Sequence, residues 1–152
     1  MKKNLNGIQD YPLGSKRKDL ITTFTGKSLA DITLTAIMNG EVTDPDIRIS
    51  SDTLLLQAQI AEQTGRTCLA ENFRRAAELC YLPDDKVLEI YNALRPFRCT
   101  KKELETIAEE LEDHYQAVLN AKLVREASCA YQERGLLKTD PQGQYGASHP
   151  FS

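Results

Sequence analysis

The feature of the sequence that most constrains the fold is a helical repeat of apolar residues after Thr100. Thr100 and Glu103 have the spacing of a capping box, in which each side chain accepts a hydrogen bond from a backbone N–H at the start of a helix. Apolar or aromatic side chains then recur at helical spacing, at Leu104, Ile107, Ala108, Leu111, Tyr115, Val118 and Leu119. No glycine or proline interrupts the chain before Gly135. We therefore expect one long C-terminal helix, about 50 Å in length at about 1.5 Å per residue.

Similar signals predict shorter helices before this long one. Capping residues, apolar repeats and stop residues place them at Ser28 to Gly40, Ser51 to Gly65, Thr67 to Cys80 and Pro83 to Pro96. In the last of these, the predicted buried face consists of Val87, Ile90, Tyr91 and Leu94. The segment from Asp44 to Ser50 combines turn residues with β-branched residues, which predicts a loop or a brief extended stretch. No stretch alternates apolar and polar residues for long enough to build a sheet, so the expected fold is all-α with irregular connections.

The start of the chain differs from this helical region. Residues 1–27 contain scattered glycines and a proline with no sustained period, which predicts an extended arm outside the core. The arm is basic, because it carries Lys2, Lys3, Lys16, Arg17, Lys18 and Lys27. The rest of the chain is acidic, because the whole chain has a net charge of −3. With 152 residues, the chain has the length of a single domain. We expect residues 28–138 to form a helical domain and residues 139–152 to form a flexible tail.

Composition narrows the classes of partner and location. The formal net charge of −3 is too small to favour a nucleic acid or a membrane surface as the partner. No segment approaches the roughly 20 apolar residues of a membrane span, and the N-terminus lacks the apolar core of a signal peptide. The four cysteines include no Cys-x-x-Cys pair for zinc or redox chemistry. We therefore expect a cytoplasmic protein whose thiols are reduced.

The candidates for catalysis or ligand binding are incomplete. Gly26-Lys27-Ser28 lacks the earlier glycine of a phosphate-binding loop, and a capped helix start explains it better. The acidic pair that begins at Asp44 resembles the start of a calcium loop, but Arg48 stands where that loop needs an oxygen ligand. Glu110 precedes His114 by one helical turn, which predicts a surface or subunit-contact pair rather than a metal site. We expect no catalytic, cofactor-binding or metal-ligating residue in this chain.

Two arginine clusters are typical of protein recognition surfaces. One is Arg74-Arg75, and the other is the run Arg95-Pro96-Phe97-Arg98. Arginine and aromatic residues are enriched where protein interfaces are held most strongly. Phosphate binding is the rival interpretation, but the flanking helices are acidic and no aromatic series is spaced for base stacking. A protein partner is therefore favoured over a nucleic acid.

Short motifs distributed along the chain carry a family resemblance. They are Asp10-Tyr11-Pro12-Leu13, Thr25-Gly26-Lys27, Asp31-Ile32-Thr33-Leu34, Arg48-Ile49-Ser50, Asn72 to Leu79, Pro83-Asp84-Asp85, Ile90 to Arg98 and Val124-Arg125-Glu126-Ala127. With these motifs, about residues 10–138 resemble the small subunit of adenosylcobalamin-dependent glycerol and diol dehydratases. Each motif alone is weak, whereas the whole series in order is specific.

The resemblance implies a hydro-lyase built from large, medium and small subunits, paired as a dimer of heterotrimers. In such enzymes, substrate and cation lie in a barrel of the large subunit, and adenosylcobalamin lies between the large and medium subunits. Homolysis of its cobalt–carbon bond starts a radical reaction that converts glycerol or a 1,2-diol to an aldehyde and water. The small subunit is helical, packs on and stabilises the large one, and contributes no catalytic residue. The resemblance thus implies that partner subunits, not this chain, bind the cofactor.

The resemblance and the arginine clusters together select the candidates for subunit contact. These are Tyr11, Pro12, Arg48, Arg74, Arg75, Tyr91, Arg95, Phe97 and Arg98. Only nine residues precede Asp10, whereas diol dehydratase small subunits often begin with a longer extension linked to encapsulation in a protein shell. This difference favours the glycerol dehydratase type, and the resemblance still allows association with a protein microcompartment.

Two alternatives to a dehydratase subunit stay open. A non-enzymatic helical adaptor could use the same arginine and aromatic residues to bind an unrelated protein. A nucleic-acid-binding arm is the other alternative, and it predicts binding that falls steeply with salt. The second is weaker, because a solvated or protein-docked arm explains Lys16, Arg17 and Lys18 equally well.

Overall fold

A computed structural model describes residues 5–139 and confirms the all-α fold. The contacts divide the chain between Tyr81 and Leu82 into two compact units. We call residues 5–81 the first unit and residues 82–139 the second unit. Within these residues the regular elements are helices, and the single β-bridge joins Thr22 to Ser28. No helix in this part of the chain combines the length and the hydropathy that a membrane span requires.

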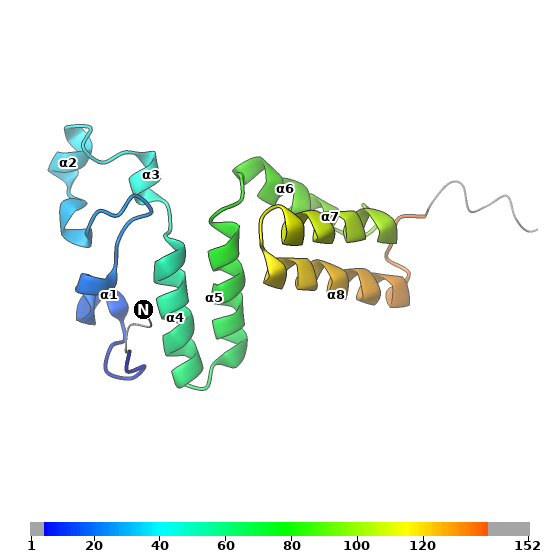
Figure 1. Cartoon of the computed structure of the whole chain (residues 1–152), viewed down its shortest axis with the longest axis horizontal. Helices are drawn as coiled ribbons and strands as arrows, with labels where there is room; N and C mark the ends of the chain where they lie inside the picture. Colours follow the sequence, from blue (N-terminus) through cyan, green and yellow to red (C-terminus); the bar gives the residue numbers. More distant parts are fainter. Residues whose placement is uncertain (1–4, 140–152) are drawn as a thin grey trace, which may run out of the picture. The chain divides into compact units, whose positions relative to one another are not determined.

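The first unit is organised around the helices α4 (Ser51–Gln63) and α5 (Thr67–Leu79), which lie side by side in Figure 1. Small side chains let the two helices approach closely, because Ala58, Ala61 and Ala70 are buried between them, with Phe73 packed alongside. The helix stop predicted at Gly65 is confirmed, because this residue has φ 76° and makes the turn between the two helices. Both helices were predicted. Thr67 is the first residue of α5, however, and does not cap it.

The N-terminal arm contributes to the core of the first unit, so its predicted place outside the core is wrong. Leu5 and Leu13 are buried in one cluster with Leu56 and Ile60 of α4. The side-chain amide of Gln63 also donates to the carbonyl of Leu5 over 2.8 Å. The arm contains the single turn α1 (Leu13–Lys16) and a 3-10 turn at Lys18–Leu20. Widely spaced leucines give no period, and periodicity therefore could not show that they pack on another helix.

The region between the arm and α4 consists of short elements rather than one helix. The helix predicted from Ser28 to Gly40 is a 3-10 turn at Leu29–Asp31 followed by α2 (Leu34–Met38). The predicted capped start at Ser28 is confirmed, because Ser28 and Asp31 form a capping box, but a second cap at Thr33 starts α2 anew. The segment predicted as a loop after Thr43 is the single turn α3 (Asp44–Ile47). Each of these elements is too short to be stable without tertiary contacts.

The second unit contains α6 (Asp84–Ala93), α7 (Lys101–Asp113) and α8 (Val118–Arg134). Helices α7 and α8 pack side by side (Figure 1), and Leu104, Ile107, Ala108, Leu111, Ala121 and Val124 are buried. The capping box of Thr100 and Glu103 at the start of α7 is confirmed. The start of α6 after Pro83 is confirmed too, but Tyr91 is 66% exposed and does not belong to its buried face.

The predicted long helix is two helices, because the chain reverses between Asp113 and Val118. The longest helix is C-terminal as predicted, but α8 accounts for only part of the expected length. Gln116 adopts φ 55° in the reversal, and the amide of Ala117 donates to the carbonyl of Leu111 over 2.8 Å. Neither glycine nor proline signals this turn in the sequence. Val118 and Leu119, the last residues of the predicted apolar repeat, lie after the reversal and are exposed.

The predicted helical domain lies within the described residues, whereas the predicted tail lies almost wholly outside them. The predicted helical domain of residues 28–138 is shared between the two units. Of the predicted flexible tail 139–152, all residues after Thr139 lie outside the described part of the chain.

Candidate subunit-contact surfaces

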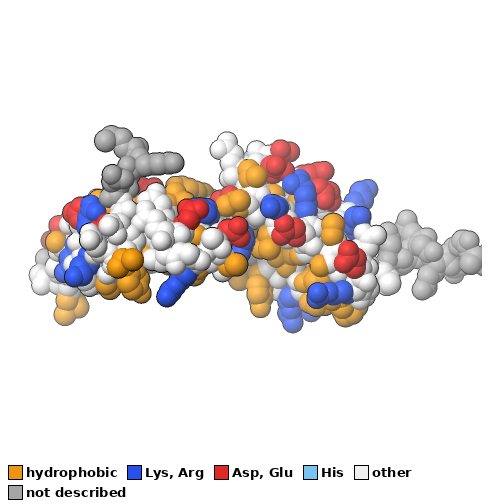
Figure 2. Space-filling view, turned by 90° about the horizontal axis from the view of Figure 1, so that it is seen from below, with side chains coloured by type: hydrophobic (Ala, Val, Ile, Leu, Met, Phe, Trp, Pro, Cys, Tyr) orange, Lys and Arg blue, Asp and Glu red, His pale blue; other side chains and the backbone are white. Residues whose placement is uncertain are grey.

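The predicted contact residues fall into two sets, one in each unit. The first unit carries Tyr11, Pro12, Arg48, Arg74 and Arg75, and the second unit carries Tyr91, Arg95, Phe97 and Arg98. Within each unit, large apolar side chains are exposed among charged ones, as Figure 2 shows for one face of the chain. Exposed apolar patches of this kind are typical of protein interaction sites.

In the first unit, Tyr11 and Pro12 border a groove of about 630 Å³. Its wall is mainly apolar, with Ile8, Leu13, Ile21, Ile60, Leu69 and Phe73, and it includes the polar side chains of Gln57 and Arg66. Tyr11 is 66% exposed and joined to Pro12 by a cis peptide bond. Sequence reasoning missed this groove, because the groove exists only where the arm packs on α4 and α5.

The arginine pair Arg74-Arg75 makes contacts within the first unit. Arg74 Nη2 lies 2.5 Å from Glu62 Oε2, so this ion pair joins α5 to α4. The guanidinium of Arg75 donates to the side-chain carbonyl of Asn72 on its own helix. Both arginines are half-buried, whereas Arg48 is exposed between the exposed Ile47 and Ile49. The pair therefore contributes to the packing of the unit, and Arg48 with its neighbours offers the more accessible surface.

In the second unit, an aromatic and basic loop follows α6. We call residues 94–99 the Phe97 loop. The side chain of Phe97 is 61% exposed, and Arg95 and Arg98 are exposed on either side of it. Backbone hydrogen bonds hold the loop to the segment after α8, from Phe97 N to Leu136 O over 2.8 Å and from Lys138 N to Cys99 O over 2.9 Å. The Phe97 loop is thus an ordered surface that presents its largest side chains to solvent.

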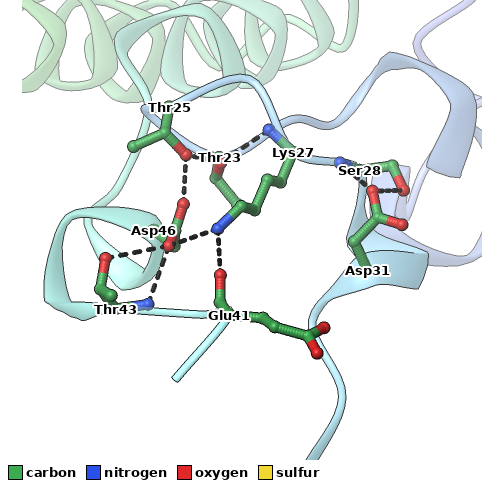
Figure 3. Close-up of polar contacts among 8 residues, drawn as sticks. All are labelled: Thr23, Thr25, Lys27, Ser28, Asp31, Glu41, Thr43 and Asp46. Carbon is green, nitrogen blue, oxygen red and sulfur yellow. Dashed lines mark hydrogen bonds and ion pairs between the residues drawn. The ribbon is translucent and has the colours of Figure 1, made fainter. Parts of the chain in front are cut away.

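A buried carboxylate, Asp46, organises the residues of the phosphate-like motif (Figure 3). Lys27 Nζ lies 2.8 Å from Asp46 Oδ2, and the ammonium group also donates to the carbonyl of Glu41. The hydroxyl of Thr25 and the backbone N–H of Thr43 donate to the same carboxylate. These contacts, first of all the one with Lys27, hold the pKa of Asp46 well below its ordinary value. The motif thus serves to fasten a loop to α3, which agrees with the structural interpretation of Gly26-Lys27-Ser28.

The other titratable side chains near α7 and α8 either join two helices or pack against a neighbouring ring. Glu110 pairs with Lys86 over 2.5 Å, so the predicted side-chain pair with His114 does not form. The ring of His114 instead packs edge-to-face against that of Tyr115 with centroids 5.2 Å apart. Arg125 bridges α8 to α7 through Glu105 and Glu112, which raise the pKa of its guanidinium.

Thiols and acidic groups are likewise scattered. All four cysteines are free in the structure, and burial raises the pKa of Cys80 and of Cys99. Among residues 5–139, no three histidine, cysteine or acidic side chains come close enough together to hold a metal ion.

Comparison with known proteins supplies the family. A sequence model of the family described as "Dehydratase small subunit" matches residues 7–138. A protein named propanediol dehydratase small subunit from Citrobacter freundii is 53% identical over 133 residues, which cover 88% of this chain and 77% of that protein. Its namesake from Salmonella typhimurium (strain LT2) matches with the same identity and coverage. The matched residues span both units and both sets of contact candidates. This chain therefore belongs to the family of dehydratase small subunits.

Proposed function

We propose that the chain is the small accessory subunit of an adenosylcobalamin-dependent glycerol or 1,2-diol dehydratase. Its role is to pack on and stabilise the large catalytic subunit. The observation that carries the proposal is the 53% identity over 133 residues to subunits named for propanediol dehydratase. Because that name specifies a propanediol, we place 1,2-propanediol ahead of glycerol as the proposed substrate of the whole enzyme. The cytoplasm, with or without a protein microcompartment, is the proposed location.

Exposed apolar side chains support the packing role. In the first unit, Ile8, Leu34 and Met38 are 83%, 77% and 79% exposed. In the second unit, Leu88 and Tyr91 on α6 are 61% and 66% exposed. Burial of each such side chain against a partner is worth about 1.5–3 kcal/mol before the costs of association. A protein partner that covers these side chains would therefore stabilise both itself and this chain.

The proposed partners are the large and medium dehydratase subunits, in a dimer of heterotrimers. A corrinoid carries many amide groups that need hydrogen-bonding partners, and the largely apolar groove bordered by Tyr11 does not fit it. We therefore assign adenosylcobalamin, which supplies the radical chemistry, to the partner subunits. The exposed apolar residues of this chain contact the partner subunits and exclude water from the interface.

Co-expression tests the proposal directly. The chain is produced with and without the large and medium subunits, and the complex is isolated by size-exclusion chromatography and analysed for stoichiometry. We expect a stable complex that converts 1,2-propanediol to an aldehyde when adenosylcobalamin is added, and no turnover by this chain alone. A complex of large and medium subunits that is equally stable and active without this chain would refute the stabilising role.

A native pull-down distinguishes the adaptor alternative. Tagged chain is recovered from an extract of cells that grow on the diol, and the bound proteins are identified by mass spectrometry. Recovery of the large dehydratase subunit supports the proposal. Recovery of an unrelated protein in stoichiometric amount, without the dehydratase subunits, would favour the non-enzymatic adaptor.

A further inference from the structure

We propose that Phe97 is the anchor with which this chain docks on its large-subunit partner. The ring would enter an apolar pocket of that partner, and carboxylates at the rim of the pocket would pair with Arg95 and Arg98. This inference rests on the proposed function, because it assumes that the partner is the large dehydratase subunit. It adds that Phe97 makes the central contact and that the receiving surface is an apolar pocket with an acidic rim.

The backbone of Phe97 is the first reason. Phe97 has φ 63°, in the left-handed region that glycine and asparagine tolerate and that bulky residues avoid. The surrounding structure holds this conformation through the hydrogen bond from Phe97 N to Leu136 O. The side-chain hydroxyl of Tyr131 secures the start of the same loop by donating to the carbonyl of Leu94. Strain of this kind is concentrated where a side chain serves a function.

The exposure of the ring is the second reason. If the Phe97 loop existed to bury an aromatic side chain within the chain, burial would offset the backbone strain. The side chain is instead 61% exposed. Within this chain, then, a phenylalanine at this position has a backbone cost and little packing gain. Contact with an apolar pocket of another protein would supply that gain, because aromatic side chains bury large areas with few rotatable bonds.

The charges around the ring give the third reason and specify the partner. Among residues 5–139, the guanidinium groups of Arg95 and Arg98 form no hydrogen bond or ion pair with a side chain. Glu89 and Glu103 line a shallow depression with Arg98, but both are already engaged. Glu89 pairs with Lys86, and Glu103 accepts from the backbone N–H of Thr100.

Other arginines of the chain show how different this pair is. Arg74 is paired with Glu62, and Arg125 with Glu105 and Glu112. Arg95 and Arg98 thus retain their capacity for forked hydrogen bonds to carboxylates. Charge complementarity points to an acidic rim around the receiving pocket, which would also orient the ring on approach.

The test is affinity for the large and medium subunits, measured with full-length chains by biolayer interferometry. Phe97→Gly removes the ring and relieves the backbone. We expect it to raise the Kd at least about 30-fold, the loss typical of an interface hot spot. We expect the midpoint of thermal unfolding of the isolated variant to equal or exceed that of the wild type. Arg95→Glu combined with Arg98→Glu should also raise the Kd, and high salt should reduce the difference from wild type.

The matched control is Gln116→Gly. Gln116 is the other non-glycine residue with positive φ among the described residues, it is exposed, and it lies in the same unit. Glycine there relieves a similar backbone conformation without removing an exposed ring from the Phe97 loop. We expect Gln116→Gly to keep the wild-type Kd, which separates loss of the anchor from relief of strain.

The outcomes separate this inference from the proposed function. If wild-type chain does not bind the large and medium subunits, the proposed function and this inference both fail. If the wild type binds and Phe97→Gly binds with the same Kd, only the inference is overturned. A marked loss of stability in isolated Phe97→Gly would also overturn it, because the ring would then serve the chain's own packing. Tight binding by the double arginine variant at low salt would reject the acidic rim.

Discussion

In the second unit, apolar side chains at helical spacing account for the packing, and Leu104, Leu111 and Val124 are at most 1% exposed. In the first unit, short turns and a non-periodic arm are held in place partly by a buried carboxylate, Asp46, which is 4% exposed. The comparison shows two ways in which a small helical chain becomes ordered. One depends on many similar contacts along two helices, and the other depends on a few polar contacts between segments distant in the sequence.

The largest effect is expected in the apolar packing of the second unit. Leu111→Ala should lower the free energy of unfolding of residues 82–139 by about 2–5 kcal/mol, because it leaves a cavity beside α8. The control Leu123→Ala, at a side chain that is 38% exposed on α8, should cost less. Hydrogen exchange of the α7 and α8 amides in increasing urea measures both. Equal losses for the two variants would contradict the interpretation of Leu111 as core.

A smaller effect is expected at the polar cluster of the first unit. Asp46→Asn removes the charge that faces Lys27 but keeps a side-chain oxygen that can accept from Thr43. We therefore expect faster hydrogen exchange in residues 22–50, and little change in α7 and α8. Asp44→Asn on the same helical turn is the control, because that carboxylate is exposed. If both variants exchanged alike, Asp46 would not be the residue that holds this region together.

Acid should weaken the same cluster selectively. The pKa of Asp46 is lowered by Lys27 and Thr25 in the folded chain, so its ionised form stabilises the fold above the ordinary carboxyl pKa of about 3.9. That stabilisation is lost progressively as the pH falls below this value toward the folded-state pKa. The stability difference between wild type and Asp46→Asn should therefore shrink between about pH 5 and pH 3. Urea titrations over this range measure it, and a constant difference would argue against the ion pair.

The smallest effect is expected at the cap of α7. Thr100→Ala removes the hydroxyl that accepts from Glu103 N over 3.3 Å and should cost about 1 kcal/mol. Thr106→Ala, in the middle of the same helix, should be neutral or slightly stabilising, because alanine is the better helix former. Urea unfolding of the second unit compares the two. A loss at Thr106 equal to that at Thr100 would show that capping is not the cause.

The comparison also explains what could be predicted from the sequence. Where apolar residues recur every turn between a cap and a stop, as from Thr100 to Leu111, both the helix and its buried face were correct. The reversal at Gln116 was missed because a non-glycine residue makes it. The core position of Leu5 was missed because it depends on Leu56 and Ile60, far along the chain. Local patterns specify local structure, and contacts between distant segments leave no period.

The candidate surfaces follow the same rule. Tyr11, Phe97 and Arg98 are exposed, whereas the motif around Arg74 also contains residues that hold the unit together. The role of the exposed residues in subunit contact stays a prediction. A short motif records that a residue type matters at a position. Whether the residue faces a partner or its own chain depends on which neighbours it meets, such as Glu62 beside Arg74.

The pairing of Leu136 and Lys138 with the loop after α6 has a practical consequence for protein engineering. These residues follow the last helix, yet their backbone groups complete the loop at Phe97 and Cys99. The family match also extends to residue 138. A shortened version that stops at Arg134 would keep α8 but remove the hydrogen-bonding partners of that loop. Purification handles and fluorescent labels should accordingly be joined beyond Lys138, so that these two backbone hydrogen bonds stay intact.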